Sequence, residues 1–378
     1  MDHAEAADLT AFDELARRFA DRDLAAATLD NDHYPFDPFP HELWQQAAEL
    51  GLADVTVPES LGGLGQGMSA LCTVLRALAT ADGSMAALIL SQAHARHLIA
   101  SLAEPAHAQR LLSATHNDAP ALFATALYDD PQDMSAGLRA TTRGGRTRLE
   151  GRLDYLICLP TARYAVVPAH LHEEGRHALF VLDLQADGVQ VSEPVLGLGL
   201  KACPAGDLVV DASVDADCQL GDETGFDTYR AVTETARLGI VATALGVLQG
   251  SYKLALDYAQ ERHQARKMII EHHMVRQMLA GMVSWIDVGS AALEQALADE
   301  ERGVSTNASR ALSIHEVVLG GVTRATTDGV QVLGGNGYMH EYGQEKRMRD
   351  AKQLQAMLGA SPTRRMDILE RALQRPGA

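Results

Sequence analysis

The sequence predicts an α+β fold in which a helical part, a β part and a second helical part follow one another. Apolar residues recur at three- and four-residue spacing in ELWQQAAELGLADV and LCTVLRALATAD, which is typical of amphipathic helices. The spacing moves toward two in ARYAVVPAH and HALFVLDL, between turn residues. Long helical patterns then return, as in TETARLGIVATALGVLQGSYKLALDYAQ. We therefore expect an all-α domain at residues 1–120, a β domain at 121–225 and a four-helix bundle at 226–378.

Composition limits the function classes. The 378 residues are 47% hydrophobic and 22% charged, which is enough to bury a large core. The net charge of -18 opposes binding to nucleic acid and to anionic membranes. No apolar run reaches the roughly 18 residues of a membrane span, and MDHAEAADLT lacks the features of a signal peptide. We expect a cytoplasmic protein that binds neither nucleic acid nor membrane.

The cysteines and histidines give no pattern typical of a metal site or a disulfide framework. The four cysteines are Cys72, Cys158, Cys203 and Cys218. They form no CxxC pair, which favours buried thiols in a reducing compartment. His94 and His97 can share a helix face and His272 adjoins His273, but neither pair has an obvious third ligand. We expect packing or surface histidines and no bound metal.

Glycine clusters occur at two places. SLGGLGQG, residues 60–67, could be a phosphate loop, but no Lys-Ser/Thr follows it and its spacing is not that of a dinucleotide-binding turn. A structural loop is the better interpretation. QVLGGNGYMHEYGQEKRMRD, near the C-terminus, has glycines that allow positive φ or close approach of a ligand. The stretch fits either a turn between helices or a nucleotide seat.

Several segments, taken in order, carry a more specific signal. They are VTVPESLGGLG, LRATTRGGRTRLEGRLDYLI, LGLKACPAGDLVVDASVDADCQLGDETGFD, ARLGIVATALGVLQGSYKLALDYAQERHQ and QVLGGNGYMHEYGQEKRMRDAKQLQ. Together they resemble the acyl-CoA dehydrogenase family of flavoproteins, over residues 43–365. The resemblance implies a helical domain, a β domain and a helical bundle. It also implies FAD as cofactor, an acyl-CoA or similar thioester as substrate, and a homodimer or homotetramer.

The resemblance assigns residues to the adenine-pyrophosphate half of an FAD held mostly by a neighbouring subunit. The family's Gln-x-x-Gly-Gly-x-Gly is present here as Gln331, Gly334, Gly335 and Gly337. Its Arg-x-Gln-Phe-Gly is present as the five residues from Arg262, with Ala and Arg in place of Phe and Gly. A guanidinium at Arg262 suits a pyrophosphate.

The resemblance is weaker around the flavin ring. The family's Trp-Ile-Thr/Ser stretch beside the isoalloxazine is Tyr155-Leu156-Ile157 here, so a ring is kept at Tyr155 but Ile157 has no hydroxyl group. We assign Tyr155 and Ile157 to the cofactor site on this likeness. The family's Thr-Glu-Pro loop is not recognisable in ATALYDDPQDMSAG.

The catalytic base of the family is missing. A thioester dehydrogenase needs a carboxylate to remove the α-proton, and the family's most common position for it is Leu358 here. Some relatives carry it just before the arginine that matches Arg237, to which we assign substrate binding, and that position is Ala236. Glu234 is a weak substitute, because two residues turn a helix by about 200°.

Two function classes follow, and whether the chain is an enzyme stays open. The first is an FAD-dependent oxidoreductase acting on an acyl thioester, with its base replaced by Leu358 and either moved elsewhere or made unnecessary by different flavin chemistry. The second is a catalytically silent subunit or binding protein with a partial flavin site, which could pair with a homologous subunit. The joint departures at the base and the ring favour the second class more than a single substitution would. The retained Arg262 and glycine block indicate that some flavin half-site persists, and the oxidoreductase is the function we expect, with the silent subunit as the alternative.

Overall fold

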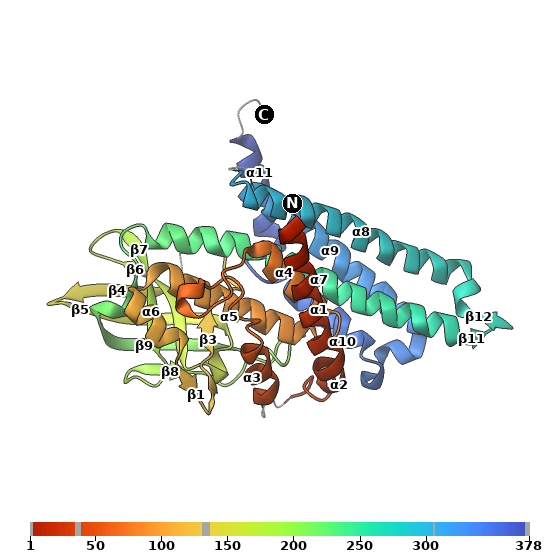
Figure 1. Ribbon diagram of the computed structural model, residues 1–378, viewed down its shortest axis with the longest axis horizontal. Coiled ribbons are helices and arrows are strands. Elements are labelled where there is room, and N and C mark those ends of the chain that lie inside the picture. The colour runs from red at the N-terminus through yellow and green to blue at the C-terminus, as the bar shows by residue number, and fades with distance from the viewer. Residues whose placement is uncertain (1–2, 35–38, 131–136, 305–306, 375–378) are drawn as a thin grey trace.

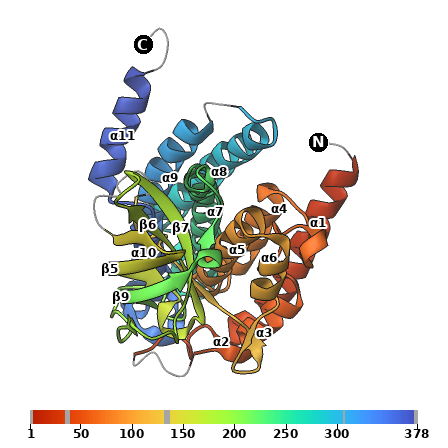
Figure 2. The ribbon, with the colours of Figure 1, turned by 90° about the vertical axis from the view of Figure 1, so that its left-hand side faces the viewer.

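The structure of the chain, a computed structural model, describes residues 3–34, 39–130, 137–304 and 307–374. Its three parts follow the predicted order. In Figure 1 the β sheet lies at one end of an elongated molecule and the long helices of the C-terminal part reach the other end, with α11 projecting from the side. Figure 2 looks at the molecule from the sheet end. The predicted α+β fold, with helical, β and helical domains, is confirmed.

The N-terminal part is a cluster of helices around the buried helix α5. Asp82 begins α5 as its N-cap, because its carboxylate accepts hydrogen bonds from the amides of Ser84 and Met85. The Gln92 side chain exchanges two hydrogen bonds of 2.9 Å with the backbone of Phe123, which fixes α5 to the sheet. The helices are α1 His3–Phe19, α2 Ala25–Ala27, α3 His41–Glu49, α4 Met68–Ala79, α5 Gly83–Leu102 and α6 Pro105–Leu112.

The middle part is a mixed sheet whose strands, in the described part of the chain, follow the order β10-β7-β6-β3-β5-β9-β8, with β4 paired to β5 and β6. A register shift between Leu153 and Leu156 interrupts the pairing of β5 with β9. The bulge gives Tyr155 a φ of 58° and turns its ring outward. The strands of this sheet are β3 Phe123–Thr125, β4 Leu138–Arg143, β5 Arg146–Ile157, β6 Tyr164–Leu171, β7 Arg176–Asp183, β8 Val189–Val191, β9 Ala205–Asp215 and β10 Gln219–Leu220. Two further short strands, β1 Thr115–His116 and β2 Ala119–Pro120, pair with each other in a separate sheet.

The C-terminal part is built around α7, which is buried along much of its length and packs against α4, α5, α8 and α9. Among the described residues α7 is the one helix long and apolar enough to span a membrane, and most of that apolar stretch is buried inside the protein. A short hairpin connects α7 to α8. The elements are α7 Gly225–Glu261, β11 His263–Gln264, β12 Lys267–Met268, α8 His273–Glu301, α9 Asn307–Leu333, α10 Gln344–Leu354 and α11 Ser361–Leu373.

A buried charged network joins the three parts. Lys346 of α10 lies 2.6 Å from a carboxylate oxygen of Asp350 and 3.3 Å from one of Asp82. The other Asp350 oxygen accepts a hydrogen bond of 2.7 Å from the amide of Leu200, which lies in the segment between β8 and β9. Buried charges are tolerated when they are paired and hydrogen-bonded, as here.

The first glycine cluster is a structural loop. The amides of Leu64, Gly65 and Gln66 donate hydrogen bonds to backbone carbonyl oxygens of residues 54–57. These amides are therefore not available to a phosphate, which agrees with the prediction. Cys72, Cys158 and Cys203 are buried free thiols, as expected, and Cys218 is partly exposed.

Candidate functional site: a closed ring cleft and an open half-site

The position of the missing base, Leu358, lies in the turn between α10 and α11. Its side chain is fully buried and its φ is 52°. The Leu358 amide donates to the carbonyl oxygen of Leu127 at 2.9 Å, and its own carbonyl accepts from Nη1 of Arg237 at 3.0 Å. The turn is thereby held against the end of the β3 segment, with a leucine side chain inside.

Glu234 is held by two arginines. Its carboxylate accepts hydrogen bonds of 2.9 Å from Arg237 on its own helix and from Arg371 on α11. Burial alone would raise the pKa of Glu234, but the two guanidinium groups outweigh burial and keep its pKa below the ordinary value. A carboxylate stabilised in this way is a poor proton acceptor, so its position argues against a role as base.

Arg237 is fully buried. Besides Glu234 and the Leu358 carbonyl, its guanidinium lies 3.9 Å from a carboxylate oxygen of Asp130. Arg237 therefore links α7 to two loops and does not present its charge to a ligand in this conformation. Its assignment to substrate binding stays a prediction.

The ring cleft, where the resemblance places the isoalloxazine, is closed. Three tyrosines from distant segments, Tyr34, Tyr128 and Tyr155, face the segment of residues 194–205 across a cavity of about 20 Å³. The rings of Tyr128 and Tyr155 meet edge to face with centroids 5.7 Å apart, and the Tyr34 hydroxyl donates to the Gly197 carbonyl at 2.7 Å. Such a cavity has room for about one water molecule, so the tricyclic isoalloxazine does not fit there in this conformation of the three tyrosines.

The other residue assigned to the ring site, Ile157, is buried in the sheet opposite Ala205. It does not line the cleft. The loop for which no family equivalent was found in the sequence, residues 124–137, lies partly outside the described residues, which end at Asp130 and resume at Gly137.

The residues assigned to the adenine-pyrophosphate half lie together at the opposite end of the molecule, where Figure 1 shows the β11–β12 hairpin. Asn336, in the glycine turn after α9, donates hydrogen bonds to the hydroxyl oxygens of Tyr258 and Tyr342. Tyr258 is one turn of α7 before Arg262, whose amide bonds back to the Tyr258 carbonyl at 2.9 Å. The glycine turn and Arg262 are therefore parts of one surface.

The three glycines of this turn differ in whether the local structure requires glycine at their positions. Gly334 has a φ of 59°, which favours glycine. Gly337 packs so closely on the carbonyl of Val330 that a side chain would collide with it. Gly335 is exposed, has ordinary φ, and a Cβ there would meet nothing within 4 Å. Nothing inside the chain requires glycine at 335, so this position suits approach by another molecule.

The surface around this turn is open and partly apolar. Gln331 and all five residues from Arg262 to Arg266 are exposed. Tyr338 and Met339, which follow the glycines, are 69% and 51% exposed. The described residues that line the ring cleft around Tyr155 include none from this surface, so the two predicted halves of the flavin site are separate in one copy of the chain.

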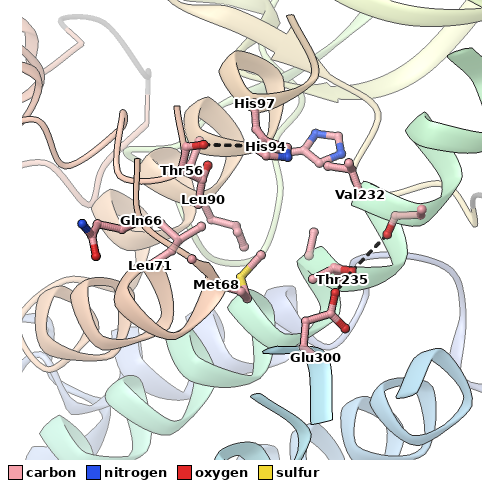
Figure 3. A pocket seen from close by; sticks show the side chains of 14 residues that line it. Thr56, Gln66, Met68, Leu71, Leu90, His94, His97, Val232, Thr235 and Glu300 are labelled. Atoms are coloured by element: carbon pink, nitrogen blue, oxygen red, sulfur yellow. Dashed lines mark hydrogen bonds between the residues drawn. The ribbon is translucent and has the colours of Figure 1, made fainter. Parts of the chain in front are cut away.

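A further cavity of about 300 Å³ lies between α4, α5, α7 and α8 and was not predicted from the sequence (Figure 3). Its walls carry Leu71 and Leu90 together with His97, Thr235 and Glu300. Ala236, where some relatives carry the base, also lines it. His94 and His97, one turn apart on α5, were considered in the sequence as possible metal ligands and are found here in one wall of the cavity.

In the described residues, the one group of potential metal ligands close enough to share an ion is Asp32, His340 and Glu345, and none of His94, His97, His272 and His273 belongs to it. Arg349 forms ion pairs with both carboxylates of this group. The group is therefore part of a partly buried ion-pair network between α10 and the N-terminal part.

Comparisons with known proteins agree with the fold. Residues 6–117 match the model of the acyl-CoA dehydrogenase N-terminal domain and residues 223–373 that of the C-terminal domain. Caffeyl-CoA reductase-Etf complex subunit CarC of Acetobacterium woodii is 26% identical, over 94% of this chain and 95% of its own length. Cyclohex-1-ene-1-carbonyl-CoA dehydrogenase of Geobacter metallireducens is 28% identical, over 96% and 97%.

A solved structure gives the same result for the fold. Butyryl-CoA dehydrogenase from Megasphaera elsdenii superposes with a TM-score of 0.86, at 23% identity, over 97% of this chain and 98% of that one. The two domain models together match well over half of the chain. The chain therefore belongs to the acyl-CoA dehydrogenase family.

Proposed function

We propose that the chain is a catalytically silent subunit of an FAD-dependent acyl-CoA oxidoreductase. In this proposal Arg262, Gln331 and the glycine turn at Gly335 hold the adenine-pyrophosphate half of an FAD whose ring lies in a homologous partner subunit. The observation that carries the proposal is the ring cleft of about 20 Å³, which is too small for the flavin ring. Neither family position for the base, Leu358 or Ala236, carries a carboxylate, which supports the proposal. Glu234, the weak substitute, is paired with Arg237.

The open half-site supports the same role. FAD supplies hydride-accepting chemistry where it is bound in relatives of this family, and in this chain the exposed residues suit its diphosphate half alone. Arg262 can donate charge-assisted hydrogen bonds to a phosphate, and Gly335 lets a nucleotide approach the backbone. The substrate of the assembled pair would be an acyl-CoA thioester, as the names of the relatives state for those proteins.

The second candidate is an oxidoreductase that holds its own flavin ring and acts on an acyl thioester. Membership of the family favours it. It requires that the three tyrosines move apart and that a residue elsewhere acts as the base, because Leu358 cannot. The name of the Acetobacterium woodii relative places that protein in an Etf complex, so an electron-transfer flavoprotein is the electron partner we propose for either candidate.

Substituting Arg262 by alanine should weaken flavin binding in the pair of this chain with its homologous subunit. One charge-assisted hydrogen bond is worth about 1.5–3 kcal/mol, so FAD affinity should fall by roughly 10- to 100-fold. Arg266→Ala, at the tip of the same hairpin, is the matched control and should have a smaller effect. The FAD retained by the purified pair after dilution measures both, and equal retention in the two variants would remove the assignment of Arg262.

A further inference from the structure

Three tyrosines close the ring cleft, and they are held in different ways. The hydroxyl of Tyr128 accepts a hydrogen bond of 2.9 Å from Gln353, and its backbone carbonyl accepts one of 3.1 Å from the amide of Gly359. Tyr155 lies within strand β5. Tyr34 belongs to no helix or strand and is 36% exposed. Tyr34 is therefore the wall of the cleft that can move without disturbing the sheet.

We propose that residues 32–34 form a strap that holds the ring cleft closed, and that release of this strap opens the cleft to a planar aromatic ring system of the isoalloxazine class. The strap is attached at two side chains, those of Asp32 and Tyr34, to segments far away in the sequence. The proposal rests on the proposed function in one respect, since it takes the cleft of the single chain to be closed.

Asp32 attaches the strap to α10. Its side chain is fully buried, and its carboxylate forms an ion pair with Arg349, which also pairs with Glu345 one turn earlier on the same helix. Nζ of Lys201 lies 4.0 Å from this carboxylate and 3.5 Å from the backbone carbonyl oxygen of Asp32, and Nδ1 of His340 lies 3.8 Å from the carboxylate. A buried carboxylate is costly unless it is paired. The ion pairs therefore hold Asp32, and with it the strap, in place.

Tyr34 attaches the strap to the segment of residues 194–205, the opposite wall of the cleft. Its hydroxyl donates a hydrogen bond of 2.7 Å to the carbonyl oxygen of Gly197. Nζ of Lys201 lies 5.0 Å from the centroid of its ring, within the range of a cation–π contact. Lys201 thus contacts both attachments of the strap. Because they share this cation, loss of either attachment should weaken the other.

The walls that remain when Tyr34 moves away suit a flat aromatic ring. The rings of Tyr128 and Tyr155, whose centroids lie 5.7 Å apart, favour contact with a further aromatic ring. Gln353 also lines the cleft, and because its amide nitrogen donates to Tyr128, its amide oxygen can accept a hydrogen bond from a ring N–H group. An isoalloxazine has both a flat ring system and such an N–H group.

The thiol of Cys203 can report whether the cleft is open. Cys203 lines the cleft and is 6% exposed. A hydrogen bond with the Cys158 thiol, together with burial, holds the pKa of Cys203 well above its usual range, so this thiol is a poor nucleophile in the closed chain. Of the other cysteines, Cys72 is buried and Cys218 is partly exposed. Release of the strap should therefore add Cys203 to the thiols that a reagent can reach.

The rate at which an aromatic disulfide reagent modifies Cys203 measures release of the strap, in the full chain with Cys218→Ser. Asp32→Asn should raise this rate by roughly 10- to 100-fold, which is the value of one charge-assisted hydrogen bond, and Tyr34→Phe by roughly 2- to 10-fold, the value of a neutral one. Asp13→Asn removes a solvent-exposed ion pair on α1 and is the matched control, so it should leave the rate unchanged.

Lumiflavin, an isoalloxazine ring without the nucleotide, tests the ligand class. Quenching of its fluorescence should show binding to the Tyr34→Ala protein and none to the unmodified protein. Binding by the unmodified protein would contradict the closed cleft, and with it the proposed function.

The strap itself has a different contradicting result. An unmodified protein that binds no lumiflavin, with strap variants that neither bind it nor react faster at Cys203, would overturn the strap and leave the proposed function standing. Equal acceleration at Cys72, which is buried in α4, would also overturn it, because the cause would be general unfolding. Faster reaction at Cys203 without lumiflavin binding would overturn the ligand class. If Asp32→Asn, at a buried position, does not fold, the variants of Tyr34 decide.

Discussion

Leu358→Glu should destabilise the protein and give it no dehydrogenase activity. Leu358 is fully buried, and the two guanidinium groups that bond to carbonyls of this turn, Arg237 and Arg364, already pair with Glu234 and Glu316. A carboxylate there is removed from water beside cations that are already paired, so the free energy of unfolding should fall by about 3 kcal/mol or more. The closed ring cleft leaves no flavin ring beside the new carboxylate.

The comparison with two neutral variants separates charge from shape. Leu358→Gln has nearly the shape of the glutamate and should lose less stability, and Leu358→Met should cost under about 1.5 kcal/mol. Denaturant unfolding measures the stabilities, and anaerobic mixing with straight-chain acyl-CoA thioesters measures flavin reduction. A stable Leu358→Glu protein that reduces bound flavin would mean that the scaffold is an intact dehydrogenase lacking only its base.

Stability should fall as the pH drops below about 6.5, the ordinary pKa of histidine. His315 on α9 is fully buried, and burial together with Arg237 and Arg364 holds its pKa well below the ordinary value. Burial does the same for His94, whose pKa is about 3. Below this pH the unfolded chain binds protons at histidines that stay neutral in the folded chain. Each such histidine therefore lowers the free energy of unfolding by up to about 1.4 kcal/mol per pH unit below 6.5.

From about pH 6.5 to 4.5 the buried histidines dominate the loss of stability, although burial raises the pKa of Asp350, which acts in the opposite direction. Glu234 and Glu316 also have lowered pKa values, but their stabilising charge is present above the ordinary carboxylate pKa and is lost only as the pH falls below it. Unfolding midpoints in denaturant at several pH values test this. His315→Leu should reduce the slope by about half, and His172→Gln, at an exposed position, should not change it. An unchanged slope in His315→Leu would refute the role of His315.

The order of helical and β parts could be read from periodicity alone, because each pattern reflects a local backbone geometry. The absence of a base at Leu358 and Ala236 could also be read, since it depends only on residue identity at positions fixed by resemblance. Which side chains are buried, and which charged groups pair with one another, could not be read from the sequence. Glu234 looks like a spare carboxylate in the sequence, and the structure shows that Arg371, far along the chain on α11, holds it.

The closed cleft illustrates the same limit. Tyr34, Tyr128 and Tyr155 belong to separate segments, and no local pattern indicates that their rings meet. The sequence also does not distinguish Gly335 from the other two glycines of its turn. The difference appears only when the φ angle and the packing of each glycine are known. The cavity between α4, α5, α7 and α8 could not be read from the sequence, although His94, His97 and Ala236 of its wall were considered there for other reasons. Contacts between distant segments set each of these features.

The most direct test of the silent-subunit proposal is the visible absorption spectrum of this chain purified alone, before and after incubation with excess FAD. We predict a colourless protein that keeps little or no flavin after gel filtration, because its own ring cleft is closed. The same chain purified together with its homologous subunit should carry flavin. A yellow protein with one tightly bound FAD per chain, obtained without any partner, would contradict the account.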